Sequence, residues 1–125
     1  MKKTLTKTVT VRYSVDPADL QPAIDYIKAN YASNPSLADI AATCSRSMFH
    51  FHRLFKLAFE TTPRAMVQAL QFDDAKRRLM AGEKLADIAV AVGFASASHF
   101  CSQFRKKTGM TPGEYRNLQR HVTTP

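Results

Sequence analysis

The sequence contains one structural unit twice, and this internal repeat restricts the possible folds more than any other feature. Residues 37–41, with the sequence LADIA, recur as residues 85–89, an offset of 48. Later residues recur with an offset of 49: Phe51, Phe55, Thr62 and Pro63 correspond to Phe100, Phe104, Thr111 and Pro112. The second copy therefore has one extra residue between its two helical segments. The pattern predicts a duplicated helix-turn-helix, and a helical repeat that only stacks to form a core is the alternative.

Start and stop signals define the helices of both copies. Thr62 can cap a long helix, Pro63 fits its first position, and Gly82 is a left-handed stop. The other helices are expected to begin at residues that can cap a helix N-terminus: Asp16-Pro17, Ser36 with Asp39, Ser47, Ser96, and the capping box Thr111 with Glu114. The helix from Asp16-Pro17 should reach about Asn30, and the last helix should carry Tyr115 and Leu118 toward the core.

We therefore expect an all-α fold with about seven helices and two helix-turn-helix subdomains. Residues 9–15, in a Thr/Lys-rich arm, alternate apolar and polar side chains like a β-strand. Because a lone strand is unstable, we expect the arm to be flexible, and pairing with another chain is the alternative. The expected segments are the basic N-terminal arm at 1–15, a first subdomain at 16–62, a linker helix at 63–81, a second subdomain at 82–120 and a loose tail at 121–125.

Composition favours a polyanionic partner. The chain has 125 residues, a net charge of +8 and a pI near 9.8, and its arm holds Lys2, Lys3, Lys7 and Arg12 before the first acidic residue. No apolar run approaches the ~20 residues of a membrane span, and the N-terminus does not resemble a signal segment. We expect a cytoplasmic protein whose two cysteines are reduced thiols.

The helix predicted after Ser47 has an unusual outer face. On a wheel centred on Phe51, Met48 falls on the inner side, whereas Phe49, Arg53 and Lys56 lie opposite. His50 and His52 occupy the flanks. The equivalent helix of the second copy, after Ser96, has Ala97 on the inner side. Its outer and flanking residues are Ser98, Ser102, Arg105, His99 and Cys101.

These residue types suit DNA. A helix in the major groove needs hydrogen-bond donors for base edges, an apolar surface for thymine methyl groups and cations for phosphates, which Arg53, Phe49 and Lys56 provide. Ser47 and Ser96 can cap their helices and contact phosphate oxygens, although capping alone is the simpler role. Lys106 extends the basic end of the second helix, where solvated charge at a helix C-terminus is the alternative.

Other chemistry is less well supported. His50 and His52, and likewise His99 and Cys101, are two residues apart, so on a helix each pair diverges and forms neither a metal site nor a nucleophile with its base. Cys44 is expected in the core because its counterpart is Val92. The glycines are dispersed and form no phosphate loop. We expect no catalytic residue, no cofactor and no metal.

The segments FHFHRLFK, KLADIAVAVGF and SHFCSQFRKKTGMTPGEYR resemble the DNA-binding domain of the AraC/XylS transcription regulators over about residues 24–120. The resemblance implies two helix-turn-helix units joined by a long helix, with recognition helices in successive major-groove segments on one face of a promoter. By position, the first helix would read bases with Phe49, His52 and Arg53, helped by His50 and Lys56. The second would use Ala97, Ser98, Cys101 and Ser102, with Arg105 near the backbone.

Two departures from the family pattern affect this expectation. The first turn lacks the common glycine and has Cys44-Ser45-Arg46 instead, and the second recognition helix has only small side chains apart from His99. We therefore expect most base specificity from the first unit. At this length the chain looks like the small stand-alone members, or like the DNA-binding part of a longer effector-responsive regulator; FHFHRLFK is also similar to members with an additional C-terminal effector domain.

The prediction is a bacterial, sequence-specific regulator of double-stranded DNA, an activator that contacts RNA polymerase, binds no membrane and acts as a monomer on a site of about 20 base pairs. A protein-interaction module on the same fold is one alternative, since exposed Phe49 also suits a protein partner. A Cys-centred alkyl acceptor of a repair protein is the other, and Cys101 would carry it.

Overall fold

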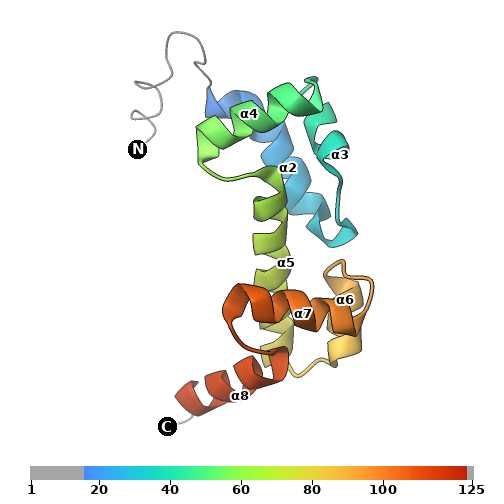
Figure 1. The fold of residues 1–125 in the computed structure, drawn as a ribbon, viewed down its shortest axis with the longest axis vertical. Coiled ribbons are helices and arrows are strands. Elements are labelled where there is room, and N and C mark those ends of the chain that lie inside the picture. The colour runs from blue at the N-terminus through green and yellow to red at the C-terminus, as the bar shows by residue number, and fades with distance from the viewer. Residues whose placement is uncertain (1–15, 124–125) are drawn as a thin grey trace. The chain divides into compact units, whose positions relative to one another are not determined.

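The computed structural model describes residues 16–123 and confirms the all-α prediction. The described part has seven α-helices, two 3₁₀ helices and no strand. The elements are η1 (Pro17–Leu20), α2 (Gln21–Asn30), η2 (Tyr31–Ser33), α3 (Leu37–Ala42), α4 (Met48–Phe59), α5 (Pro63–Met80), α6 (Leu85–Ala91), α7 (Ala97–Thr108) and α8 (Pro112–Thr123) (Figure 1). The expectation for the N-terminal arm concerns residues outside the described part.

The predicted capping residues make the hydrogen bonds that start these helices. Ser36 Oγ accepts from the Asp39 amide at 3.1 Å, and the Asp39 carboxylate accepts from the Ser36 amide at 3.3 Å. Thr111 and Glu114 form the same reciprocal box at the start of α8. Thr62 Oγ1 accepts from the Ala65 amide at 3.0 Å in the first turn of α5. Each bond satisfies a backbone donor that a helix start leaves free.

Two predicted boundaries were wrong. The single helix expected from Asp16-Pro17 is split into η1 and α2, because Pro22 has no amide to continue an α-helical ladder, and the preceding turn closes through the Gln21 amide and the Ala18 carbonyl instead. At the other end, residues 121–123 were expected in a loose tail but belong to α8. No glycine or proline interrupts residues 114–123, so the helix has no reason to stop earlier.

The structure divides into two compact units that share α5. The first unit comprises residues 16–31 and 35–69, and the second comprises residues 32–34 and 70–123. Residues 32–34 belong to the second unit because the Gln71 amide donates to Asn34 Oδ1 at 3.3 Å and the Ala32 carbonyl lies beside Gly93. The expected subdomain limits at residues 62 and 82 stay a prediction.

The core of the first unit supports α4. In this unit α3 packs against both α2 and α4, and η1 packs against α2 and α4 (Figure 1). The buried apolar residues of the unit come from η1, α2, α3, α4 and the first turns of α5: Leu20, Ala23, Ile24, Ile27, Ile40, Ala41, Phe51, Leu54, Phe55, Ala58 and Val67. The side of α4 that faces this core is therefore fixed.

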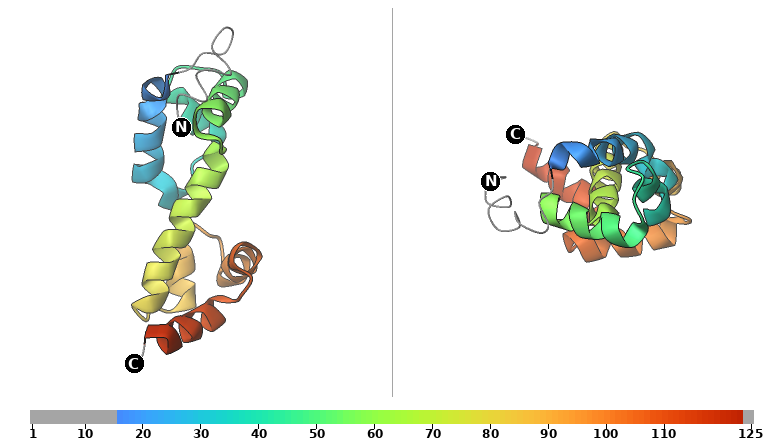
Figure 2. Two further views of the ribbon diagram at one scale, coloured as in Figure 1. Left: turned by 90° about the vertical axis from the view of Figure 1, so that its left-hand side faces the viewer. Right: turned by 90° about the horizontal axis from the view of Figure 1, so that it is seen from above.

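The second unit has an aromatic core that holds α7 against α6 and α8 (Figures 1 and 2). The Phe104 ring lies 5.9 Å from Phe72, 5.6 Å from Phe100 and 5.6 Å from Tyr115. Tyr115 is thus directed inward as predicted. Leu118 is not, since it is 46% exposed and α8 extends past the core by that point.

Arg116 and Arg78 fasten the end of α5. Arg116 donates to the carbonyl oxygens of Leu79 at 2.8 Å and Glu83 at 2.7 Å, which ties α8 to the turn after α5. Arg78 donates to Glu83 and Asp74, and the hydrogen bonds with these two carboxylates raise its pKa. These bonds therefore favour the charged form of the guanidinium.

The turns that follow α5 and α6 have the same backbone geometry. After α6, the Phe94 amide donates to Ala89 O at 2.8 Å and the Gly93 amide donates to Val90 O at 3.2 Å, with φ of +99° at Gly93. Gly82 occupies the matching position after α5 with φ of +86°. This Schellman arrangement requires a left-handed residue, which glycine adopts without strain.

In the first copy, Ser45 takes the place of Gly93. Its φ is +53°, so it adopts the left-handed conformation despite having a side chain. The Ser45 amide donates to Ala42 O at 3.2 Å, as the Gly93 amide does to Val90 O, so the left-handed position is kept without a glycine. The left-handed serine leaves backbone strain just before α4.

Candidate nucleic-acid interface

The predicted first recognition helix is α4, and its start is fixed by Ser47. Ser47 Oγ accepts a hydrogen bond from the His50 amide at 3.2 Å. The helix ends at Glu60, whose φ of +57° stops the chain from continuing in an α-helix. Phe51, Leu54, Phe55 and Ala58 are buried, which orients the opposite face of the helix outward.

That outward face carries the residues selected from the sequence. Phe49 is 81% exposed, and His50, Arg53 and Lys56 are also exposed. His52 is half-buried on the flank. Phenylalanine is usually buried, so an exposure of this size on a helix is unusual. Where exposed apolar side chains gather, they commonly mark a binding surface.

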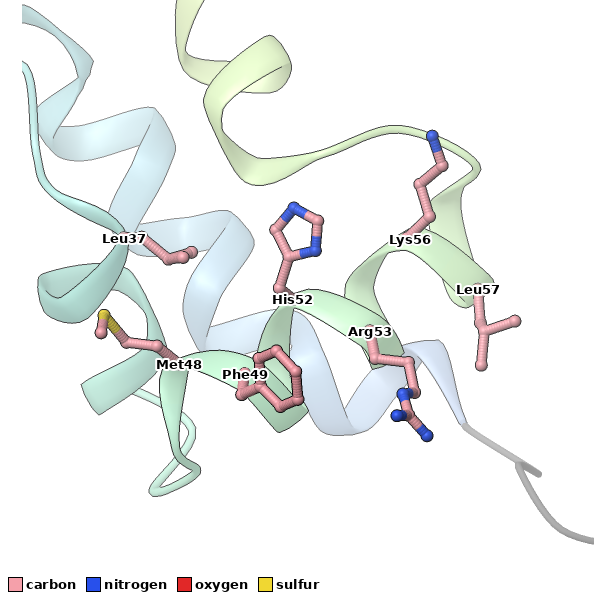
Figure 3. Close-up of a pocket in the computed structure, with 7 residues that line it drawn as sticks. All are labelled: Leu37, Met48, Phe49, His52, Arg53, Lys56 and Leu57. Atoms are coloured by element: carbon pink, nitrogen blue, oxygen red, sulfur yellow. The ribbon is translucent and has the colours of Figure 1, made fainter.

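A pocket of about 510 Å³ lies on the same face. Leu37 and Met48 lie at one end of it and Lys56 and Leu57 at the other, with Phe49, His52 and Arg53 between them (Figure 3). The lining combines an apolar floor with two cationic side chains. We call these seven residues the α4 surface.

The sequence predicted four residues of the α4 surface and missed three. Met48 was placed inside by the helical wheel, but it is 49% exposed because it is the first residue of α4, where no preceding turn covers it. Leu37 comes from the start of α3 and reaches α4 only through tertiary packing. Leu57 lies on the helix flank, next to Lys56, and its exposure depends on the neighbouring elements.

The second recognition helix, α7, is built in the same way but has a different outer face. Ser96 Oγ accepts from the His99 amide at 3.1 Å, and Phe100 and Phe104 are fully buried. The predicted residues divide by exposure: Ser98, His99, Ser102, Arg105 and Lys106 are exposed, and Ala97 and Cys101 are half-buried.

Two predicted residues of α7 have contacts inside the protein. The His99 ring lies 5.4 Å from the Phe94 ring, so one side of this imidazole already packs on the turn. Cys101 packs against the core of the second unit. The freely projecting side chains of α7 are therefore small hydroxyls and terminal cations.

The cysteines and histidines do not gather into a reactive or metal-binding cluster within residues 16–123. Both cysteines are free thiols. Cys44 was expected in the core but is half-buried, with its Sγ 3.7 Å from Thr43 Oγ1, because it lies in the exposed turn after α3 and not at the end of a helix like Val92. Within residues 16–123, no three His, Cys, Asp or Glu side chains are placed to hold a metal ion. None of the helices described is long and apolar enough to span a membrane.

Residues 40–118 match the family model described as a helix-turn-helix domain. The bifunctional transcriptional activator/DNA repair enzyme AdaA of Bacillus subtilis is 35% identical over 101 residues, covering 80% of this chain and 48% of that protein. The melibiose operon regulatory protein of Escherichia coli K12 is 30% identical over 105 residues, or 82% of this chain and 35% of that protein. The chain thus spans about half or less of the length of these relatives.

Solved structures show the same fold. An AraC-type transcriptional regulator from Chromobacterium violaceum superimposes with a TM-score of 0.72 at 30% identity, covering 81% of this chain and 91% of that one. A DNA-binding transcriptional dual regulator from Escherichia coli K-12 gives a TM-score of 0.70 at 25% identity, with 82% and 93% coverage. The family model, the relatives and the structures agree, and the chain belongs to the AraC family of transcription regulators, in which it is a DNA-binding helix-turn-helix domain.

Proposed function

We propose that this chain activates transcription by binding a specific double-stranded DNA sequence, with α4 and α7 in successive segments of the major groove. The observation that carries the proposal is the α4 surface, where Phe49 is 81% exposed beside Arg53 and Lys56. The buried face of α4 holds these side chains outward before any DNA arrives. Binding therefore needs little reorganisation of the helix.

In the proposed complex, each side chain of α4 has a different task. Arg53 donates to a guanine edge, which offers two acceptors to a guanidinium. Phe49 contacts the methyl group of thymine, and Lys56 pairs with a phosphate. His50 and His52 add donors on the two flanks of the helix.

The second helix contributes less to sequence recognition in this proposal. Ser98 and Ser102 are exposed but short. A hydroxyl can either donate or accept a hydrogen bond, so these serines discriminate weakly between bases. Arg105 and Lys106, at the C-terminal end of α7, are suited to phosphates. Ser47 and Ser96 already accept helix-capping bonds, which leaves their hydroxyl hydrogens for phosphate oxygens.

The names of two relatives support the proposed role in activation. AdaA is named a transcriptional activator, and so is the lactose operon protein of Staphylococcus xylosus, which is 26% identical over 112 residues. We propose that this chain likewise recruits RNA polymerase and that one copy binds one asymmetric site, since the two helices are already present in one chain. The proposal gives the chain no catalytic step and no cofactor.

The coverage of the relatives supports a second arrangement. Because the chain matches only 34–48% of the length of the first two curated relatives, it also fits as the DNA-binding part of a larger, effector-responsive regulator. In both arrangements α4 and α7 have the same role. The two arrangements differ in whether an effector-responsive part of a larger protein controls DNA binding.

The experiment is selection from a randomised DNA pool, followed by sequencing and binding measurements on the enriched site. We expect one asymmetric motif with two parts about one helical turn apart. Arg53→Ala should weaken binding to the selected site by roughly 1–3 kcal/mol and affect random DNA less. A pool without enrichment would refute sequence-specific recognition, and equal losses on both DNAs would make Arg53 a phosphate contact.

The α4 surface also fits a protein partner, which makes a protein-interaction module the second candidate function. Apolar side chains and a pocket of about 510 Å³ are typical of such sites as well. The dependence of binding affinity on salt concentration distinguishes DNA binding from binding to a protein partner. Binding through phosphates falls by about 0.9 log unit per contact for each decade of salt, whereas an apolar protein interface changes little.

A further inference from the structure

Arg46, in the turn between α3 and α4, is a cation that makes no hydrogen bond or ion pair with another residue of the described part of the chain. It directly precedes Ser47, the N-cap of α4, and it is half-buried. Its Nε atom is buried and has no hydrogen-bond partner among the described residues. Arg46 was not among the candidates from the sequence, because a single arginine in a turn has no periodic signal.

An external acceptor would have to reach the terminal nitrogens of Arg46, because the unpaired Nε atom itself is buried. Burying a donor without an acceptor costs free energy, and a guanidinium keeps its charge at any physiological pH. In contrast, Arg78, which is similarly covered, bonds to two carboxylates. Within residues 16–123, Arg46 has no such bond to give up when an acceptor from another molecule approaches.

We propose that Arg46 binds a phosphate of the DNA and thereby positions α4 in the groove. This inference rests on the proposed function and adds a residue to its interface. The planar guanidinium matches two phosphate oxygens, and a bound phosphate at this place would also face the positive N-terminal end of α4. A turn that leads into a helix lying in the major groove runs beside the groove edge, where the phosphates are.

The second unit has no equivalent of this contact. Ser47 corresponds to Ser96, so Arg46 corresponds to Ala95, which is exposed and uncharged. The phosphate contact therefore belongs to the helix with the larger base-reading side chains. It would fix the register of α4, on which Phe49 and Arg53 depend.

The test is Arg46→Met, which keeps an apolar stem and removes the charge. Binding to the selected site and to a random duplex is measured by fluorescence anisotropy over a salt series. We expect a loss of roughly 3- to 10-fold on both DNAs at 0.1 M salt and a decrease of about 0.9 in the slope of log K against log salt. Thermal unfolding should be unchanged or shifted upward, because a buried unpaired donor is removed.

Arg77→Met is the matched control, since it removes the same charge from an exposed arginine of α5. Its salt slope should equal that of the native chain. Ala95→Arg is the reciprocal variant and should raise the slope. An unchanged slope for Arg46→Met would overturn the inference, and so would an affinity loss that parallels a fall in melting temperature. If the native chain selects no DNA motif but Arg46→Met still lowers the slope, sequence recognition fails and the phosphate contact stands.

Discussion

Gly93 is the position where one added methyl group should disturb the second unit most. Its φ is +99°, and a Cβ at this place would lie 2.8 Å from the Ala32 carbonyl oxygen and 3.0 Å from Gln71 Nε2. Real Cβ atoms do not approach a backbone oxygen this closely. Gly93→Ala must therefore move the backbone at Ala32, or the Gln71 amide that donates to Asn34, or both.

The magnitude follows from these separate effects. A side chain in the left-handed region costs about 1–2 kcal/mol, and disturbing a buried polar contact adds about 1–3 kcal/mol. Alanine recovers about 0.4–1 kcal/mol by restricting the unfolded chain. We expect Gly93→Ala to lower the free energy of unfolding by roughly 2–4 kcal/mol.

Gly82→Ala separates the backbone effect from the steric effect. Gly82 has nearly the same φ, +86°, but no atom lies within 4 Å of its added Cβ. Its replacement should cost about 1 kcal/mol or less. Urea unfolding followed by circular dichroism at 222 nm suits this comparison, because the chain has no tryptophan. If the two variants differed by less than about 0.5 kcal/mol, the close approach of Ala32 to Gly93 would be refuted.

Three further predictions concern other parts of the structure. Ser45→Gly should raise the free energy of unfolding by about 0.5–1 kcal/mol, because it relieves a left-handed serine, and a urea titration that shows destabilisation would contradict this. Arg116→Met should cost about 1.5–3 kcal/mol in the same assay, since the Glu83 carbonyl loses the Arg116 donor and the Leu79 carbonyl keeps only the Gly82 amide; an unchanged midpoint would be the opposing result. Replacing thymine by deoxyuridine in the half-site of α4 should weaken binding of the native chain by about 0.8 kcal/mol per buried methyl group, and binding of Phe49→Ala should not change. Equal sensitivity of both proteins would remove Phe49 from base recognition.

Local signals in the sequence predicted most of the helices. Ser36, Ser47, Thr62, Ser96 and Thr111 all make the capping bonds expected of them. These predictions succeeded because a cap acts within three residues of the chain. The exposure of Phe49 was also predictable, since a buried helical face determines the opposite one.

The failures concern tertiary contacts and helix ends. A helical wheel treats each residue as if it lay within a long helix, so it placed Met48 inside although this first residue of α4 has no turn before it. The wheel also could not show that α8 extends past its neighbours before Leu118. Leu37 and Arg46 gain their importance from packing between α3 and α4, which the sequence of either helix alone does not contain.

The two copies differ in backbone strain as well as in side chains. The left-handed positions that flank α7 are Gly93 and Gly109, with φ of +99° and +84°, whereas those that flank α4 are Ser45 and Glu60, with φ of +53° and +57°. Each non-glycine in this region costs about 1–2 kcal/mol. The strained copy is also the one with the chemically varied outer face.

Backbone strain and a varied outer face would occur in the same copy if the two copies had different functions in DNA binding. Strain is tolerated near a binding surface when the surrounding structure over-determines the conformation, and buried Phe51 and Phe55 provide that constraint for α4. In the second copy, glycines occupy both left-handed positions, so these turns carry no such strain, and the outer face of α7 has mostly small hydroxyl side chains. The aromatic core of this copy and the bonds from Arg116 supply stability. In the proposed complex, therefore, the first unit selects the sequence, and the second contributes a stable fold and phosphate contacts that strengthen binding without choosing the site.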